Sequence, residues 1–236
     1  MSLSDESWIK TSDAGYFITL MMSQAVTTRP DNISNFATQF YRRLGTCQHV
    51  LGQNFATLKA SRHNRRAFVL CCRDAFSGFA QDTMMSTFDH AILVRALCPN
   101  IATALLHEIH FLITPLGKEQ TRTYNVRELN FGLYFILLYD DWLTSMKPDF
   151  GMDSNPKYLK INEAERVMQR IMTDHEIHFD MPTNGALKHI FADLKMAFGE
   201  DSEISFDTFR RGCVACKYLR DEMFLLLPAV ESKDSM

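Results

Sequence analysis

The chain has 236 residues, of which 46% are hydrophobic, and its formal net charge at pH 7 is −3. This length suits one compact domain with a small appendage, and the apolar content excludes wholesale disorder. The slightly negative net charge argues against nucleic-acid binding, which would need a basic face on the protein. The polar, acidic start is unlike a signal peptide, and the longest apolar run, 131–139, is stopped by two aspartates. We therefore expect a soluble, intracellular protein without a membrane span.

The six cysteines do not follow the spacing of a disulfide framework in a small secreted domain. They fall mostly within helical patterns, and we expect them to be reduced and structural: Cys47, Cys71, Cys72, Cys98, Cys213 and Cys216. This agrees with the intracellular assignment.

Residues 14–45 are predicted to form a helical hairpin after a flexible N-terminus at 1–13. Pro30 separates the two helices, Asp31 is the expected N-cap of the second helix, and Gly45 is its expected left-handed stop. Two short helices bury too little apolar surface to stand alone, so a second copy or a partner helix is expected to cover them. The expected contact residues are apolar: Phe17, Leu20, Met21, Ile33, Phe36 and Phe40.

Residues 46–80 are predicted to be connector helices with a basic cluster in the middle. The cluster consists of Arg62, His63, Arg65, Arg66 and Arg73. It could meet an acidic partner through charge-assisted bonds, above all through Arg62, Arg65 and Arg66. A solvated helix face explains the same pattern more simply, because exposed charges are common and contribute little.

Residues 81–228 are predicted to form the larger helical domain, followed by a flexible end at 229–236. Polar capping residues precede helical patterns at four places: Ser86, Asn100, Asn125 and Asn162. Two last helices are expected over 185–198 and 206–226. No strand alternation is visible, so the predicted fold class is all-α.

Two segments of this domain resemble degenerate EF-hands. Each has a helix, a polar loop, a short apolar contact and a second helix, with Tyr124 and Ile204 as the apolar contacts. A calcium loop needs carboxylates or amides at several fixed positions. The first loop offers Glu119 and Glu128, and the second offers Asp201. Because most ligands are missing, we expect helix–loop–helix packing units rather than a calcium sensor.

No pattern in the sequence indicates a catalytic, cofactor or metal site. His107 and His110 share a helix face, but zinc needs further ligands that the sequence does not indicate. Cys213 and Cys216 form one CxxC inside a helical pattern, without a second one to complete a tetrahedral site. There is also no phosphate-binding glycine loop and no nucleophile elbow. We therefore expect no catalytic residues, no cofactor and no metal.

The segment MMSQAVTTRPDNISNFATQFYRRL resembles the docking and dimerization fold of the regulatory subunit of cyclic-AMP-dependent kinase. The resemblance lies in an Arg-Pro turn, a Phe-Ala pair and a following aromatic pair and leucine: Arg29, Pro30, Ile33, Phe36, Ala37, Phe40, Tyr41 and Leu44. It covers about the first fifth of the chain. In that family, the hairpin forms an antiparallel dimeric four-helix bundle whose groove accepts an amphipathic helix, and many relatives work in cilia.

The next segment, LKASRHNRRAFVLCCRDAF, resembles the family of subunit 1 of the tubulin polyglutamylase complex. His63, Arg66, Ala67 and Phe68 match its histidine and Arg-Ala-Phe core, whereas 69–72 replaces a polar run there. Two later segments, YNVRELNFGLYFILLYDDW and ISFDTFRRG, are similar in place and pattern.

The resemblance implies a non-catalytic scaffold that places a separate tubulin-tyrosine-ligase-like ligase on microtubules. Its partners would be this ligase, the other complex subunits and tubulin. Its location would be the cytoplasm and cytoskeleton, at the cilium, basal body or centrosome and in neuronal processes. The alternative is an axonemal or ciliary docking protein of the same hairpin class without a role in glutamylation.

Overall fold

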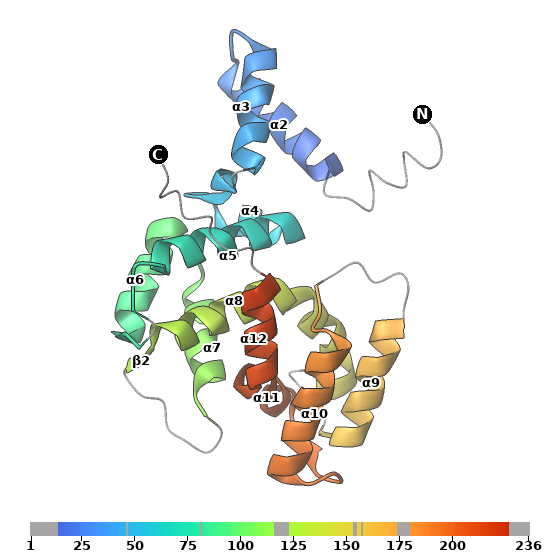
Figure 1. Ribbon diagram of the computed structural model, residues 1–236. Coiled ribbons are helices and arrows are strands. Elements are labelled where there is room, and N and C mark those ends of the chain that lie inside the picture. The colour runs from blue at the N-terminus through green and yellow to red at the C-terminus, as the bar shows by residue number, and fades with distance from the viewer. Residues whose placement is uncertain are drawn as a thin grey trace.

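The computed structural model describes residues 14–45, 47–80, 82–115, 123–152, 155–156, 158–173 and 180–226. These residues are mostly helical, which confirms the all-α fold class. A small N-terminal hairpin stands off a larger helical body (Figure 1). The flexible ends predicted at 1–13 and 229–236 lie outside the described residues.

The N-terminal part is built from short elements that lead into the body. These are α2 (Ala14–Thr28), α3 (Ile33–Gly45), the 3-10 helix η1 (Gln48–Val50), α4 (Phe55–Lys59) and α5 (Arg62–Phe76). The first two form the hairpin, where the sequence predicts two helices. Ser61 caps α5 by accepting a hydrogen bond from the backbone N–H of Asn64 over 3.1 Å.

The body contains seven further helices among the described residues: α6 (Thr87–Leu97), α7 (Thr103–Ile113), α8 (Val126–Met146), α9 (Ile161–Thr173), α10 (Asn184–Phe198), α11 (Phe206–Ala215) and α12 (Lys217–Leu226). The longest, α8, is buried along most of its length. A helix that is apolar on all sides has to be surrounded by other elements. It packs against α5 and α7, and its aromatic side chains form the centre of the core.

In the described part of the chain, three short antiparallel strand pairs join the loops of the body. They are β1 (Met84–Ser86) with β2 (Thr123–Asn125), β3 (Gly151–Met152) with β4 (Asn155–Pro156), and β5 (Leu159–Lys160) with β6 (Glu203–Ile204). The second pair follows the 3-10 helix η2 (Lys147–Phe150). The sequence analysis expected no strands. It missed these because strands of two or three residues are too short to show an alternating pattern.

Two of these strand pairs hold the helix–loop–helix units together. Tyr124 pairs with Met85, and Ile204 pairs with Leu159. The sequence analysis identified Tyr124 and Ile204 as apolar loop contacts but missed their partners. Three of these four strands, β1, β2 and β5, directly precede a helix, and β6 is separated from α11 only by its N-cap Ser205. The candidate ligand Glu119 lies outside the described residues.

Several expected helix limits are corrected by the structure. Asn100 does not begin α7, since its side chain accepts a hydrogen bond from the backbone N–H of Phe55 over 3.0 Å. Asn162 lies inside α9, which begins one residue earlier. The single helix expected over 206–226 is broken at Cys216, whose ψ of 114° is not helical. The first and last residues of a helix depend on which side chains form hydrogen bonds with backbone groups, and a sequence pattern predicts them poorly.

One hydrophobic core spans both the connector helices expected at 46–80 and the domain expected at 81–228. α5 contributes Phe68, Val69 and Cys72 to the same buried cluster as α8. α5 is therefore part of the body. Within the described ranges, none of the helices combines the length and the apolar composition that a membrane-spanning helix requires.

Candidate docking site

The turn between α2 and α3 is fixed by backbone and cap geometry. Arg29 adopts a left-handed conformation with φ of 47°, and its N–H donates to the carbonyl of Ala25 over 2.9 Å. The side chain of Asn32 accepts from the backbone N–H of Asn35 over 2.9 Å and caps α3. The N-cap is therefore Asn32, whereas the sequence analysis expected Asp31.

The end of the hairpin also differs from the expectation. Gly45 is the last residue of α3 and is not among the glycines with positive φ. The left-handed residue is Cys47, with φ of 59°. A β-carbon makes this conformation costly, so surrounding contacts have to hold it. Cys47 accepts a hydrogen bond at its carbonyl from the thiol of Cys71 on α5 over 3.4 Å.

The inner face of the hairpin packs against its own chain. Of the six predicted partner contacts, Phe17 and Phe40 are buried, and Leu20, Met21 and Phe36 are partly buried. Phe17 lies edge-on to the imidazole rings of His49 and His63, with centroid distances of 5.8 and 5.0 Å. Intramolecular contacts therefore occupy Phe17 and Phe40, and this arrangement does not support their assignment to a partner.

Asn64 of α5 joins the hairpin to the body through polar contacts. Its Nδ2 donates to the hydroxyl of Tyr16 on α2 over 3.2 Å and to the carbonyl of Thr57 over 2.7 Å. Its Oδ1 lies 3.0 Å from Nε2 of His49. Burial lowers the pKa of His49, which favours the neutral imidazole at this junction. Asn64 is itself buried, so these bonds satisfy an otherwise costly amide.

The outer face of the hairpin carries apolar side chains that no described element covers. Ile18, Met22 and Val26 recur at i, i+4 and i+8 along α2, and Met22 and Val26 are 59% and 75% exposed. Ile33, at the start of α3, is 66% exposed. We call these four residues the outer stripe. The sequence analysis selected only Ile33 from it, because α2 is apolar on both sides and its pattern did not distinguish them.

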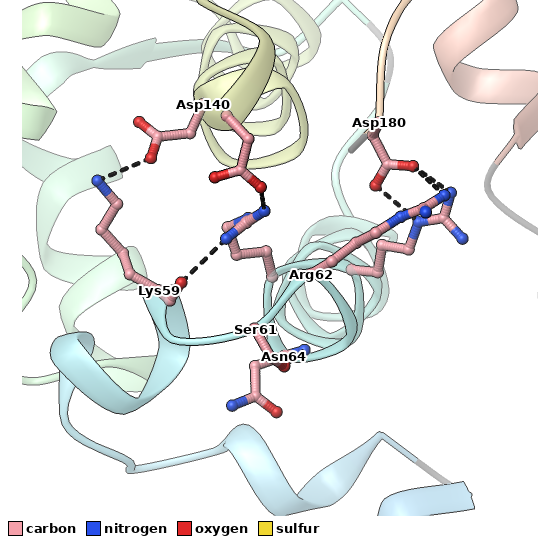
Figure 2. A network of polar contacts seen from close by, with 9 residues as sticks. Lys59, Ser61, Arg62, Asn64, Asp140 and Asp180 are labelled. Carbon is pink, nitrogen blue, oxygen red and sulfur yellow. Dashed lines mark hydrogen bonds and ion pairs between the residues drawn. The ribbon is translucent and has the colours of Figure 1, made fainter. Parts of the chain in front are cut away.

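The basic cluster on α5 is paired within the chain (Figure 2). Arg65 forms an ion pair with Asp141 of α8, and its Nη1 donates to the carbonyl of Lys59 over 2.9 Å. Arg65 is 4% exposed, so the structure does not support its predicted contact with an acidic partner. Lys59 pairs with Asp140 over 2.9 Å.

Two other arginines of the cluster share one carboxylate. Arg62 and Arg66 each lie 2.5 Å from Oδ1 of Asp180, which precedes α10 (Figure 2). Both guanidinium groups remain partly exposed. The cluster thus connects α5 to α8 and to the segment before α10. These ion pairs fix α5, the helix against which the base of the hairpin packs. Contact of Arg62 and Arg66 with an external acidic partner stays a prediction.

The described residues bring together no group of three or more histidine, cysteine or acidic side chains that could hold a metal ion. His107 is exposed, and His110 stacks on Tyr124. Cys213 and Cys216 are both buried, and burial raises the pKa of each thiol. Such thiols are poor nucleophiles at neutral pH.

In comparisons with known proteins, no family model, curated protein or solved structure matches this chain.

Proposed function

We infer that this chain is a non-catalytic scaffold subunit that docks a partner through the outer stripe of its N-terminal hairpin. The sequence resemblance suggests that the assembly is a tubulin polyglutamylase complex, with the ligase on a separate subunit. The protein would then help to place that ligase on microtubules.

The observation that carries this proposal is the exposure of the outer stripe. Large apolar side chains gathered on one small element are typical of interaction surfaces. The hairpin projects from the body, so a partner helix can reach it (Figure 1). Its base is held by Tyr16 and Phe17 against α5, which leaves the outer stripe on an element already fixed in place.

The test replaces Met22 and Val26 together with aspartate in the tagged full-length chain. Each aspartate would face the apolar surface of the partner without a counter-charge, so partner recovery is expected to fall by at least about tenfold. Proteins recovered from ciliated or neuronal cells are quantified by mass spectrometry, and the eluate is assayed for ATP-dependent glutamylation of tubulin.

The matched control replaces Asn35 and Thr38 of α3 with aspartate. Both are exposed on the side of α3 that faces away from Ile33, and the hydroxyl group of Thr38 donates to the carbonyl of Ser34 in the same helix. Recovery should be unchanged in this control. Equal recovery with the Met22 and Val26 variant would refute docking through the outer stripe. Recovery of axonemal proteins without glutamylation would refute the polyglutamylase assignment and favour the ciliary alternative.

A further inference from the structure

A cavity lies in the body, away from the hairpin. It has a volume of about 270 Å³ and lies between the C-terminal end of α7, the first turns of α8, and α11 and α12. Its apolar wall includes Leu112, Phe131 and Val214, all of which are buried. The charged residues lining it are Arg211, Arg220 and Glu128. The two guanidinium groups decide what the cavity can bind.

Arg211 is held in place by the end of α7. Its Nη2 donates to the carbonyls of Thr114 over 2.6 Å and of Pro115 over 2.8 Å, and its Nε donates to Thr114 over 3.2 Å. Its guanidinium also lies over the ring of Phe111, 5.1 Å from the centroid. Among the described residues, Nη1 of Arg211 has no acceptor. The group is therefore fixed but retains donor capacity.

Arg220 is held in a similar way on the other side. Its Nη2 donates to the carbonyl of Val214 over 3.3 Å, and its guanidinium lies 5.2 Å from the centroid of the Phe131 ring. Its Nε is buried without a hydrogen-bond partner in the described part of the chain. A buried donor without an acceptor leaves the positive charge of this guanidinium poorly compensated, and a nearby anion would offset that charge.

The nearby carboxylate does not fully compensate these charges. Oε1 of Glu128 lies 4.0 Å from Nη1 of Arg220, which is beyond hydrogen-bond distance, and the Glu128 side chain is 44% exposed. Two guanidinium groups and one carboxylate leave a net charge of about +1 on the cavity wall at pH 7. This charge matches a single carboxylate better than a phosphate dianion.

We propose that this cavity binds a monocarboxylate with a small apolar body. The planar carboxylate would accept hydrogen bonds from the two guanidinium groups, and the apolar body would lie against Leu112, Phe131 and Val214. Both the C-terminal residue of a peptide and a free aliphatic acid have this chemistry. The site is independent of the outer stripe, so its test does not depend on the proposed docking role.

The test uses small probes and the full-length protein, followed by NMR chemical-shift changes and isothermal titration calorimetry. N-acetyl-leucine carries the carboxylate and an apolar body, whereas N-acetyl-leucinamide lacks the charge and N-acetylglycine lacks the apolar body. We expect N-acetyl-leucine to bind at least about tenfold more tightly than either control, because charge-assisted bonds and apolar burial both contribute. Hexanoate is the probe for a free acid.

Two variants separate the charge argument from a purely structural role. Arg220→Gln should weaken binding of N-acetyl-leucine by at least about tenfold, and Glu128→Gln should tighten it by about threefold, because it removes the opposing charge. Arg170→Gln is the control, since Arg170 lies on α9 and pairs with Asp149 outside the cavity. Ala215→Phe would fill the cavity mouth at an exposed position and should also abolish binding.

The outcomes are distinct. Shift changes at Thr114 and Val214 with opposite effects of the Arg220 and Glu128 variants would support the site. Stronger binding of N-acetyl-leucine than of hexanoate would indicate a peptide C-terminus, and the reverse order a free acid. Equal binding of N-acetyl-leucine and its amide, or no binding of any carboxylate, would overturn the proposal.

Discussion

Buried polar residues fix specific partners in this molecule. His90 on α6 is fully buried, and its Nε2 lies 3.3 Å from Oδ1 of Asn130 on α8. The ring also lies 5.4 Å from the Phe76 ring, measured between centroids. Burial lowers the pKa of His90 from 6.5 to about 4, since the imidazolium would lose its hydration without gaining a carboxylate partner.

This burial predicts a loss of stability in mild acid. His90 is protonated near pH 6.5 in the unfolded chain and only near pH 4 in the folded chain. Neutral His90 therefore contributes fully to the free energy of unfolding above pH 6.5, and this contribution declines as the pH falls to 4. The free energy of unfolding should fall by a total on the order of 3 kcal/mol. Urea unfolding measured between pH 8 and pH 4 checks it. A His90→Gln variant, which keeps an amide for Asn130, should show a flatter pH profile; parallel profiles would contradict the assignment.

At the scale of elements, close helix packing depends on small residues at crossing points. A β-carbon on Gly132 of α8 would lie 2.8 Å from Cγ2 of Ile113 and 3.0 Å from Cγ2 of Ile109, both on α7. These branched side chains are stiff at χ1 and cannot move away easily. The two helices can therefore approach each other only because glycine occupies this position.

Gly132→Ala is accordingly expected to destabilise the protein by about 1–3 kcal/mol through overpacking, despite the better helix propensity of alanine. Thermal and urea unfolding measure the change. The control is Gly45→Ala at the end of α3, where no atom lies within 4 Å of the added carbon and no loss is expected. Adding Ile113→Ala to Gly132→Ala should recover part of the loss by making room. An unaffected Gly132→Ala variant would show that α7 and α8 are not closely packed.

For the whole molecule, the hairpin and the body differ in how they are stabilised. The main buried cluster extends from Val50 to Met223 and contains no residue of α2 or α3. Phe17 and Phe40 are buried outside that cluster, at the base of the hairpin. The body should therefore fold without the hairpin, whereas the hairpin depends on the body.

Removal of residues 1–45 tests this dependence. We expect a single cooperative unfolding transition, with a free energy of unfolding lowered by about 3–6 kcal/mol, because the buried side chains of Phe17 and Phe40 are both lost at about 1.5–3 kcal/mol each. Far-UV circular dichroism should lose only the signal of two helices. Urea unfolding followed by tryptophan fluorescence reports on the body, because Trp142 is fully buried there. Loss of the cooperative transition would mean that the hairpin belongs to the folding unit.

The sequence determined the fold class, most helices and the position of the hairpin, because apolar periodicity and local caps act within a few residues of the chain. Ser86 shows this, since its side chain accepts from the backbone N–H of Asp89 over 3.0 Å as expected. Only the tertiary structure decided which side of α2 stays exposed, that Arg65 pairs with Asp141, and that Arg211 and Arg220 line one cavity. These contacts join residues far apart in the chain, and periodicity within one helix carries no information about its distant neighbours.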